Sequence, residues 1–137
     1  SAKYLNTLNY ESQTKRYIDS FEEYKDLVFV AVKDNEVLGY SCFNYSHEKF
    51  DSELVSLYIK PGSLHRWIWS SLLVETWKEL YANWKKNMIV YCLKDNEAAI
   101  KFYKKMWGTI VEEKDVIIWN DHYIEYWFYF DLKKIIE

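Results

Sequence analysis

Hydrophobic and polar positions along the chain change their period several times, and each period predicts an element. Within residues 11–25, Tyr17, Ile18, Phe21 and Tyr24 recur at helical spacing among charged residues. This pattern predicts an amphipathic helix near the start of the chain.

Three strands are predicted next. Val28 to Val32 is a continuous apolar run that predicts a buried strand, and Asp34-Asn35-Glu36 supplies turn residues after it. The run from Val37 to Asn44 should therefore pair with it as a hairpin. Residues 46–51 are polar and form the next turn, so Glu53 to Lys60 is predicted as a third, hairpin-connected strand.

A long helix is predicted from about Leu64 to about Trp84, because the apolar residues there repeat at i, i+3, i+4 and i+7. The stripe consists of Trp69, Leu72, Leu73, Thr76, Trp77, Leu80 and Trp84. Met88 to Leu93 is apolar without alternation, which is typical of a central parallel strand that is covered on both faces.

The last third of the chain predicts one more helix and one more hairpin. Asp95 or Asn96 caps a helix that runs to about Met106. Residues 109–118 and 122–131 then form two strands around a turn. A long crossover between strands requires a parallel pair, and the hairpins supply antiparallel pairs. The predicted fold class is therefore α/β, with a mixed sheet and helices on its faces.

Composition narrows the class of protein. A chain of 137 residues predicts a single domain spanning 1–137, and an aromatic content of 20% predicts an aromatic core or cleft. The net charge is −3 and no run of basic residues exceeds a pair, which argues against nucleic acid as a partner and fits a cationic substrate.

The two cysteines and the hydropathy predict a location. Cys42 and Cys92 lie inside apolar strand-like runs without metal spacing or a disulfide framework, which predicts a reducing cytoplasm and no metal site. No apolar stretch approaches the ~20 residues of a membrane span, and no signal-peptide pattern is present, so no membrane partner is expected.

Two segments together resemble one family. The first is Glu53-Leu54-Val55-Ser56-Leu57-Tyr58-Ile59-Lys60-Pro61, followed after a loop by Ser70-Ser71-Leu72-Leu73. The second is Asn96-Glu97-Ala98-Ala99-Ile100-Lys101-Phe102-Tyr103. Strand, proline, loop, long helix, strand and Asn-x-x-Ala-x-x-Phe-Tyr resemble the GNAT superfamily of acyl-CoA N-acyltransferases.

The resemblance covers about residues 26–131. GNAT domains usually begin with one more strand and helix, which are here absent or reduced to Tyr4–Tyr10. The chain also lacks an initiator methionine. We expect it to be a C-terminal piece of a longer protein, or a processed or trimmed chain.

The resemblance implies an N-acetyltransferase that transfers acetyl from acetyl-CoA directly to an amine in a ternary complex. Family members splay the strand of Ser56, Leu57, Tyr58 and Ile59 from the following parallel strand, and a bulge aims the backbone at the cosubstrate. A regular strand is the alternative. The acceptor would be a small-molecule or peptide amine, for which Asp51, Glu53, Glu112 and Glu113 suggest a positive charge. A homodimer is left open.

The phosphate-binding loop departs from the family. Its members have Gln/Arg-x-x-Gly-x-Gly/Ala, whereas this chain has Leu64-His65-Arg66-Trp67-Ile68-Trp69-Ser70. The helix N-terminus still offers N–H groups to a pyrophosphate, but glycine lets a ligand approach the backbone and tryptophan does not. We expect Trp69 to turn toward the core and Trp67 to face the loop and solvent.

Three explanations of these tryptophans are open. Trp67 swings aside and CoA binds, with Arg66 and His65 pairing its phosphates. Alternatively, the indole fills the pocket, and the domain is an inactive module that binds a ligand or a protein. The third explanation is a misreading of the genetic code, because Trp107 also replaces the glycine of the family's Phe-Tyr-x-x-x-Gly-Phe.

The resemblance also implies catalytic roles. Glu53 is expected as a general base acting through water, and Tyr103 as the acid that protonates the CoA sulfur. Asn96, with Ala99 and Phe102 of the same motif, is expected at the cosubstrate. The alternatives are a solvated strand-end glutamate, an ordinary amphipathic tyrosine and an ordinary helix cap.

The three histidines carry less information. His47, His65 and His122 lie far apart in sequence and near no acid or cysteine pattern, so solvated loop positions are expected. Only His65 borders the phosphate loop.

Overall fold

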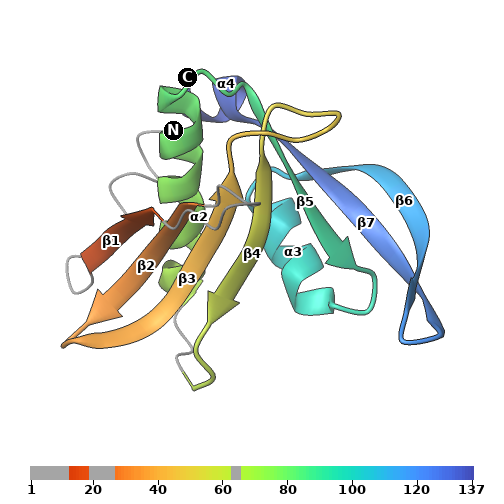
Figure 1. The fold of residues 1–137 in the computed structure, drawn as a ribbon, viewed down its shortest axis with the longest axis horizontal. Coiled ribbons are helices and arrows are strands. Elements are labelled where there is room, and N and C mark those ends of the chain that lie inside the picture. The colour runs from red at the N-terminus through yellow and green to blue at the C-terminus, as the bar shows by residue number, and fades with distance from the viewer. Residues whose placement is uncertain (1–12, 19–26, 63–65) are drawn as a thin grey trace.

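A computed structural model describes residues 13–18, 27–62 and 66–137 of the chain, without the side chains of residues 13–18 and 66. Its described elements are β1 (Gln13–Ile18), β2 (Leu27–Lys33), β3 (Glu36–Asn44), β4 (Glu53–Ile59), α2 (Arg66–Ala82), β5 (Asn87–Leu93), α3 (Glu97–Lys105), β6 (Thr109–Ile118), β7 (Asp121–Asp131) and α4 (Leu132–Ile136). The strands form one seven-stranded sheet in the order β1-β2-β3-β4-β5-β7-β6 (Figure 1). Its only parallel pair in the described residues is β4–β5, so the predicted mixed sheet is confirmed.

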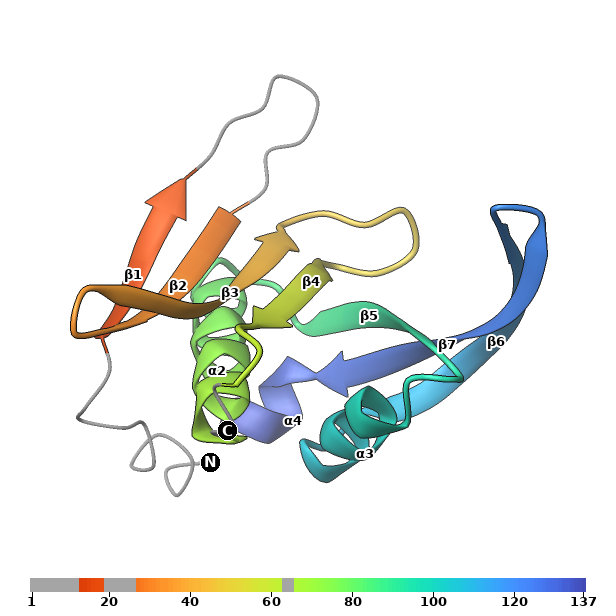
Figure 2. The ribbon, with the colours of Figure 1, turned by 90° about the horizontal axis from the view of Figure 1, so that it is seen from below.

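The described helices lie on one face of the sheet. Figure 2 shows α2 below the β2–β4 half, α3 below β5 and β7, and α4 beside α2. The long crossover from β4 through α2 to β5 joins parallel strands and thus returns to the same sheet. Helices were expected on both faces, and the described residues show them on one.

The helix predicted for residues 11–25 is wrong where the structure describes it. Residues 13–18 form β1, which pairs antiparallel with β2 from Gln13–Val32 to Ile18–Leu27. The backbone groups along the edge of β2 need hydrogen-bond partners, and this pairing outweighs a short helical period. Residues 19–26 of that prediction lie outside the described residues.

The long helix is confirmed but ends earlier than predicted. It stops at Ala82, and the side chain of Trp84 is 90% exposed instead of continuing the buried stripe. The short helix α4 was not predicted. It begins because Asp131, the last residue of β7, accepts a hydrogen bond from the backbone N–H of Lys134 at 3.1 Å.

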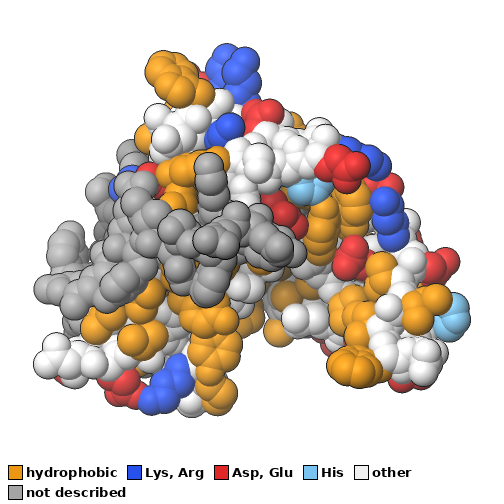
Figure 3. Space-filling model, in the orientation of Figure 1, with side chains coloured by type: hydrophobic (Ala, Val, Ile, Leu, Met, Phe, Trp, Pro, Cys, Tyr) orange, Lys and Arg blue, Asp and Glu red, His pale blue; other side chains and the backbone are white. Residues whose placement is uncertain are grey.

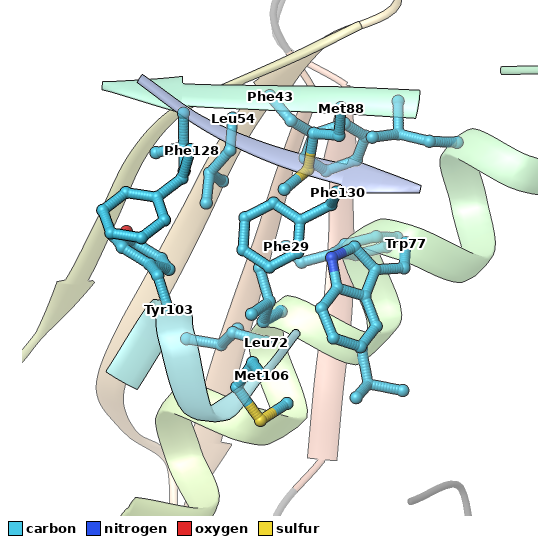
Figure 4. Packing of buried hydrophobic residues seen from close by; sticks show 14 of the residues in the cluster. Phe29, Phe43, Leu54, Leu72, Trp77, Met88, Tyr103, Met106, Phe128 and Phe130 are labelled. Carbon is cyan, nitrogen blue, oxygen red and sulfur yellow. The ribbon is translucent and has the colours of Figure 1, made fainter. Parts of the chain in front are cut away.

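The core lies between the helices and the sheet. Figure 4 shows Phe29, Phe43 and Leu54 of the first half meeting Phe128 and Phe130 of β7. Leu72 and Trp77 of α2, Met88 of β5, and Tyr103 and Met106 of the α3 region complete the cluster. The predicted aromatic core is therefore confirmed.

A buried polar contact fixes α2 on the sheet. The hydroxyls of Ser41 in β3 and Thr76 in α2 lie 2.8 Å apart, and Thr76 also donates to the carbonyl of Leu72. Both side chains are fully buried. Because Thr76 gives its proton to Leu72, Ser41 donates to the Thr76 oxygen, and this contact satisfies the buried Ser41 hydroxyl.

Candidate functional site

The sheet opens between β4 and β5. These strands pair only at Glu53–Ile89 and Leu54–Val90, at the end where both begin. Beyond Leu54 the two strands diverge, and Figure 3 shows the surface hollowed between the β2–β4 half and the β6–β7 half. The expected split of the sheet is thus present.

A bulge in β4 lies at the point where the opening begins. Cys42 of β3 pairs with Ser56 and Phe43 pairs with Leu54, so Val55 is the extra residue on β4. A bulge bends its strand and increases the local twist, which turns β4 away from β5. The expected bulge is therefore present, and the regular strand is not.

The predicted cosubstrate-binding residues of β4 line this opening. Ser56, Leu57 and Ile59 are partly buried, and Tyr58 is exposed. Each is paired with β3 on one side, from Ser56–Cys42 to Ile59–Gly39. Within the described residues no strand pairs with their other side, so backbone groups there are available to a ligand.

The start of α2 differs from expectation. Leu64 and His65 lie outside the described residues, and α2 begins at Arg66. Ile68 is fully buried, while Trp67 is half-buried and packs against the core. The expectation that Trp67 faces solvent is therefore wrong, because Ile68 anchors the first turn and turns its neighbour toward the protein.

Trp69 brings α2 and α3 together instead of entering the core. Its ring contacts Phe102 edge-on, with ring centroids 5.0 Å apart, and both side chains are half-buried. Ser70 is also half-buried. The tryptophan of the predicted phosphate loop thus lies beside the Asn-x-x-Ala-x-x-Phe-Tyr helix.

Tyr103 is buried on the helical side of the sheet. Its ring packs on Phe128 and Phe130 of β7, with centroids 5.5 and 6.0 Å away. Burial, with a smaller contribution from the Cys92 thiol, raises the pKa of Tyr103 above its usual value. The phenol therefore stays protonated at neutral pH and lies near the C-terminal end of β5.

The first turn of α3 confirms that Asn96 caps the helix, and it does not test the expected contact of Asn96 with the cosubstrate. Its side-chain oxygen accepts a hydrogen bond from the N–H of Ala99 at 3.2 Å, which makes it the helix cap. Ala99 itself is buried in the core. Contact of either residue with the cosubstrate stays a prediction.

His47 is not a solvated loop residue. Its Nδ1 accepts hydrogen bonds from the N–H groups of Lys49 and Phe50, at 3.0 and 3.2 Å. Nδ1 is therefore unprotonated, so the neutral ring carries its proton on Nε2 and donates it to the Tyr91 hydroxyl. Burial lowers the pKa of His47, which keeps this neutral form.

Tyr91 receives that hydrogen bond on the face of the sheet opposite the helices. Burial raises the pKa of Tyr91 to about 12, and the nearby carboxylates of Glu53, Glu125, Glu48 and Glu112 add to the rise. The phenol is therefore neutral, and because it accepts from His47, its own proton is available to a further acceptor.

The acidic residues near Tyr91 differ in part from those expected. Glu53 and Glu112 are among them, as predicted, whereas Asp51 accepts a hydrogen bond from the N–H of Lys86 at 2.8 Å and so holds the start of β5. Glu113 lies opposite Tyr126, one position from the Glu112–Trp127 pair, and therefore faces the other side of the sheet. Figure 3 shows acidic side chains interspersed with basic ones beside β5–β7.

Trp127 packs beside Tyr91 in this acidic region. Its ring packs on Tyr91 with centroids 4.6 Å apart, and its N–H donates to Glu125 at 3.0 Å. The ammonium groups of Lys114 and Lys49 lie 4.1 and 5.4 Å from the ring centroid. The region thus already holds two cations against an aromatic face.

Sequence reasoning missed His47, Tyr91 and Trp127. They come from the β3–β4 loop, β5 and β7, and only the pairing of Tyr91 with Trp127 across the sheet brings them together. No spacing along the chain indicates such a contact.

The described residues contain neither a metal-binding cluster nor a membrane-spanning helix. No group of three or more His, Cys, Asp or Glu there could hold a metal ion. Within the same residues, no helix has the length and apolar content needed to cross a membrane.

One family model matches most of the chain. The family model described as "Acetyltransferase (GNAT) family" matches residues 3–108. No protein in the curated collection matches the chain.

Solved structures share the fold. A GNAT family acetyltransferase from Elizabethkingia anophelis with acetyl-CoA bound matches with a TM-score of 0.73 and 9% identity, over 90% of this chain and 99% of that one. An N-acetyltransferase from Staphylococcus aureus Mu50 matches with a TM-score of 0.67 and 19% identity, over 78% of this chain and 68% of that one. A putative acetyltransferase from Salmonella typhimurium with acetyl-CoA matches with a TM-score of 0.68 and 19% identity, and this match covers 78% of this chain and 65% of that one.

Proposed function

Since this chain belongs to the GNAT acetyltransferase family, we propose that it is an acetyl-CoA-dependent N-acetyltransferase that acts on an amine by direct transfer in a ternary complex. The observation that supports this most is the opening of the sheet beyond Glu53–Ile89 and Leu54–Val90, next to the bulge at Val55. It leaves the edge of β4 free to hydrogen-bond the amide groups of an extended ligand, as an added strand would.

The described residues fit such a cosubstrate well along β4 and less well at its pyrophosphate end. Ser56 to Ile59 offer the unpaired strand edge, and the first turn of α2 offers N–H groups to a pyrophosphate. Trp67 and Trp69 belong to that turn, where Trp67 packs against the core and Trp69 packs on Phe102. The pyrophosphate end is therefore where the fit is poorest.

Tyr103 suits the role of general acid. In the reaction the acceptor nitrogen bonds to the acetyl carbon, the carbon–sulfur bond breaks, and the leaving thiolate takes a proton. Because its pKa is raised, the Tyr103 phenol holds its proton at neutral pH and can supply it. The amine proton leaves through water to Glu53 at the start of β4.

The acceptor is proposed to be cationic. Four carboxylates lie near Tyr91, and the Trp127 ring already has two lysine ammonium groups over it. A small-molecule or peptide amine would be attracted by the same carboxylates and would reach the ring by displacing one of these lysines. The Tyr91 hydroxyl, fixed by His47, would orient the acceptor molecule by donating a hydrogen bond to one of its neutral oxygen or nitrogen atoms, because an ammonium group has no lone pair to accept one. A cytoplasmic location and a homodimer belong to the same proposal.

The second candidate is a GNAT domain without catalysis. It is favoured by one observation, the packing of Trp67 against the core at the place where the pyrophosphate would bind. In this case the indole permanently fills the phosphate end of the site.

Chromatographic detection of released CoA tests both candidates. We would incubate the protein with acetyl-CoA and a panel of polyamines and peptide amines, because thiol reagents would also label Cys42 and Cys92. Acceptor-dependent release that falls in Tyr103→Phe supports the enzyme. No release with any acceptor, together with no binding of acetyl-CoA at millimolar concentration, supports the inactive module.

A further inference from the structure

Three tryptophans have a backbone conformation that tryptophan rarely adopts. The φ angles are 67° at Trp84, 69° at Trp107 and 50° at Trp119. The other non-glycine residues with positive φ in the described chain are all Asp or Asn, which tolerate this region. A bulky side chain there is an outlier, because its Cβ crowds the backbone.

Trp84 and Trp107 occupy the same position at the ends of two helices. After α2, the N–H of Lys85 donates to Leu80 and that of Trp84 to Tyr81, at 3.0 Å each. These two bonds define a Schellman motif, with Trp84 at the left-handed C′ position.

The end of α3 repeats this geometry. Gly108 donates to Tyr103 at 2.7 Å, and Trp107 donates to Lys104 at 3.2 Å. Trp107 is therefore the C′ residue of a second Schellman motif. Glycine is the usual residue at C′, since it has no Cβ to strain.

Trp119 lies in a two-residue hairpin turn. Ile118 pairs with Asp121, so Trp119 and Asn120 form the turn between β6 and β7, both with positive φ. Such a type I′ turn requires positive φ at both residues and is usually built from Gly, Asn or Asp. The β2–β3 hairpin shows the same turn with Asp34 and Asn35.

Trp84, Trp107 and Trp119 are also more exposed than the tryptophans of the protein interior. Trp84 and Trp119 are 90% and 92% exposed and Trp107 is 46% exposed, whereas Trp77 and Trp127 are buried. The chain also has only 3 glycines, where average usage would give about ten. Glycine is thus scarce, and tryptophan stands at positions that need it.

We propose that positions 84, 107 and 119 are glycine in the protein made by its own cell. The codon UGA is read as tryptophan in some genetic codes and as glycine in others, so one reassigned codon would account for all three positions. This inference rests on the backbone and on exposure, and it holds whatever the domain binds.

The same codon reassignment would also place glycine at positions 67 and 69. Both have helical backbone, so φ does not mark them, but both are only partly buried, in the first turn of α2. Glycine at both would remove two indoles from the first turn and let a ligand approach its N–H groups closely. The crowding at the phosphate end of the site would then disappear.

Peptide masses of the protein purified from its own cells test the proposal. Trypsin cleaves after Lys and Arg, so peptide 79–85 contains position 84 and peptide 106–114 contains position 107. Peptide 115–133 contains position 119 together with Trp127, which serves as an internal control. Fragmentation should give glycine at 84, 107 and 119 and tryptophan at 127.

Tryptophan at 84, 107 and 119 in these peptides would overturn the proposal. Peptide 67–78 tests the extension, with glycine expected at 67 and 69 and tryptophan retained at the buried position 77. The gene provides an independent check, since UGA is expected at the three positions and UGG at any of them contradicts the proposal. Neither measurement depends on acetyl-CoA binding, so failure of the proposed function would leave this inference standing.

Discussion

Replacing Trp84 by glycine and by alanine measures the strain at the end of α2. Both variants remove the same indole, which is 90% exposed, so the loss of buried area is small and equal in the two. They differ in the Cβ, which costs about 1–2 kcal/mol in the left-handed region. Glycine gives back about 0.4–1 kcal/mol through the greater freedom of the unfolded chain.

The difference predicts that Trp84→Gly is more stable than Trp84→Ala by about 0.5–1 kcal/mol. Urea unfolding followed by circular dichroism measures this free energy directly, and the melting temperatures should differ by a few degrees in the same direction. The matched control is Lys78, an exposed residue inside α2. There Lys78→Ala should be more stable than Lys78→Gly by about 1 kcal/mol, the ordinary helix preference.

The sign reversal between the two positions is the test. If alanine stabilises the protein as well as glycine does at position 84, the φ of 67° is not the conformation in solution. The inference of glycine at that position would then lose its structural basis. If both positions favour alanine, the ordinary preference for alanine outweighs any strain at position 84, and the turn does not require glycine.

Three further predictions concern the site. Tyr103→Phe should lower turnover by about 10²-fold with unchanged acetyl-CoA affinity, as loss of a general acid requires; unchanged turnover would return Tyr103 to a packing role. Glu53→Gln should remove the acid limb of the pH–rate profile, because a base must be deprotonated to act; a limb that stays in place assigns the proton to another group. Burial lowers the pKa of His47. Below about pH 6.5 the unfolded chain therefore binds a proton that the folded ring resists, so the protein becomes less stable as the pH decreases. His47→Gln should lose less stability between pH 7 and 5 in urea unfolding, and equal slopes would contradict the assignment.

Much of the fold could be predicted because its elements have strong local signals. The continuous run of β5 and the Asp34-Asn35 turn specify their structures by themselves. The N-terminal prediction failed because residues 13–18 take their conformation from the edge of β2, which no local period reveals.

Which residues of the candidate site lie close together could be predicted only within a single element. Asn96 and Tyr103 lie on one helix, so their spacing placed them together. The His47–Tyr91 contact joins a loop and a strand that are distant in sequence, and it depends on the sheet being formed first. The start of α2 was misjudged because helical spacing alone cannot show that Ile68, and not Trp69, faces the core.

Calorimetric titration with acetyl-CoA tests the central claim, that the open sheet and the start of α2 form a cosubstrate site. The protein with Trp67→Gly and Trp69→Gly is compared with the parent and with the double alanine variant, which removes the indoles but keeps each Cβ. The account predicts micromolar binding by the glycine variant, tighter than in either comparison. Its stability should fall, because two glycines in the first helical turn cost about 1 kcal/mol each. A folded glycine variant that does not bind acetyl-CoA at millimolar concentration would contradict the account.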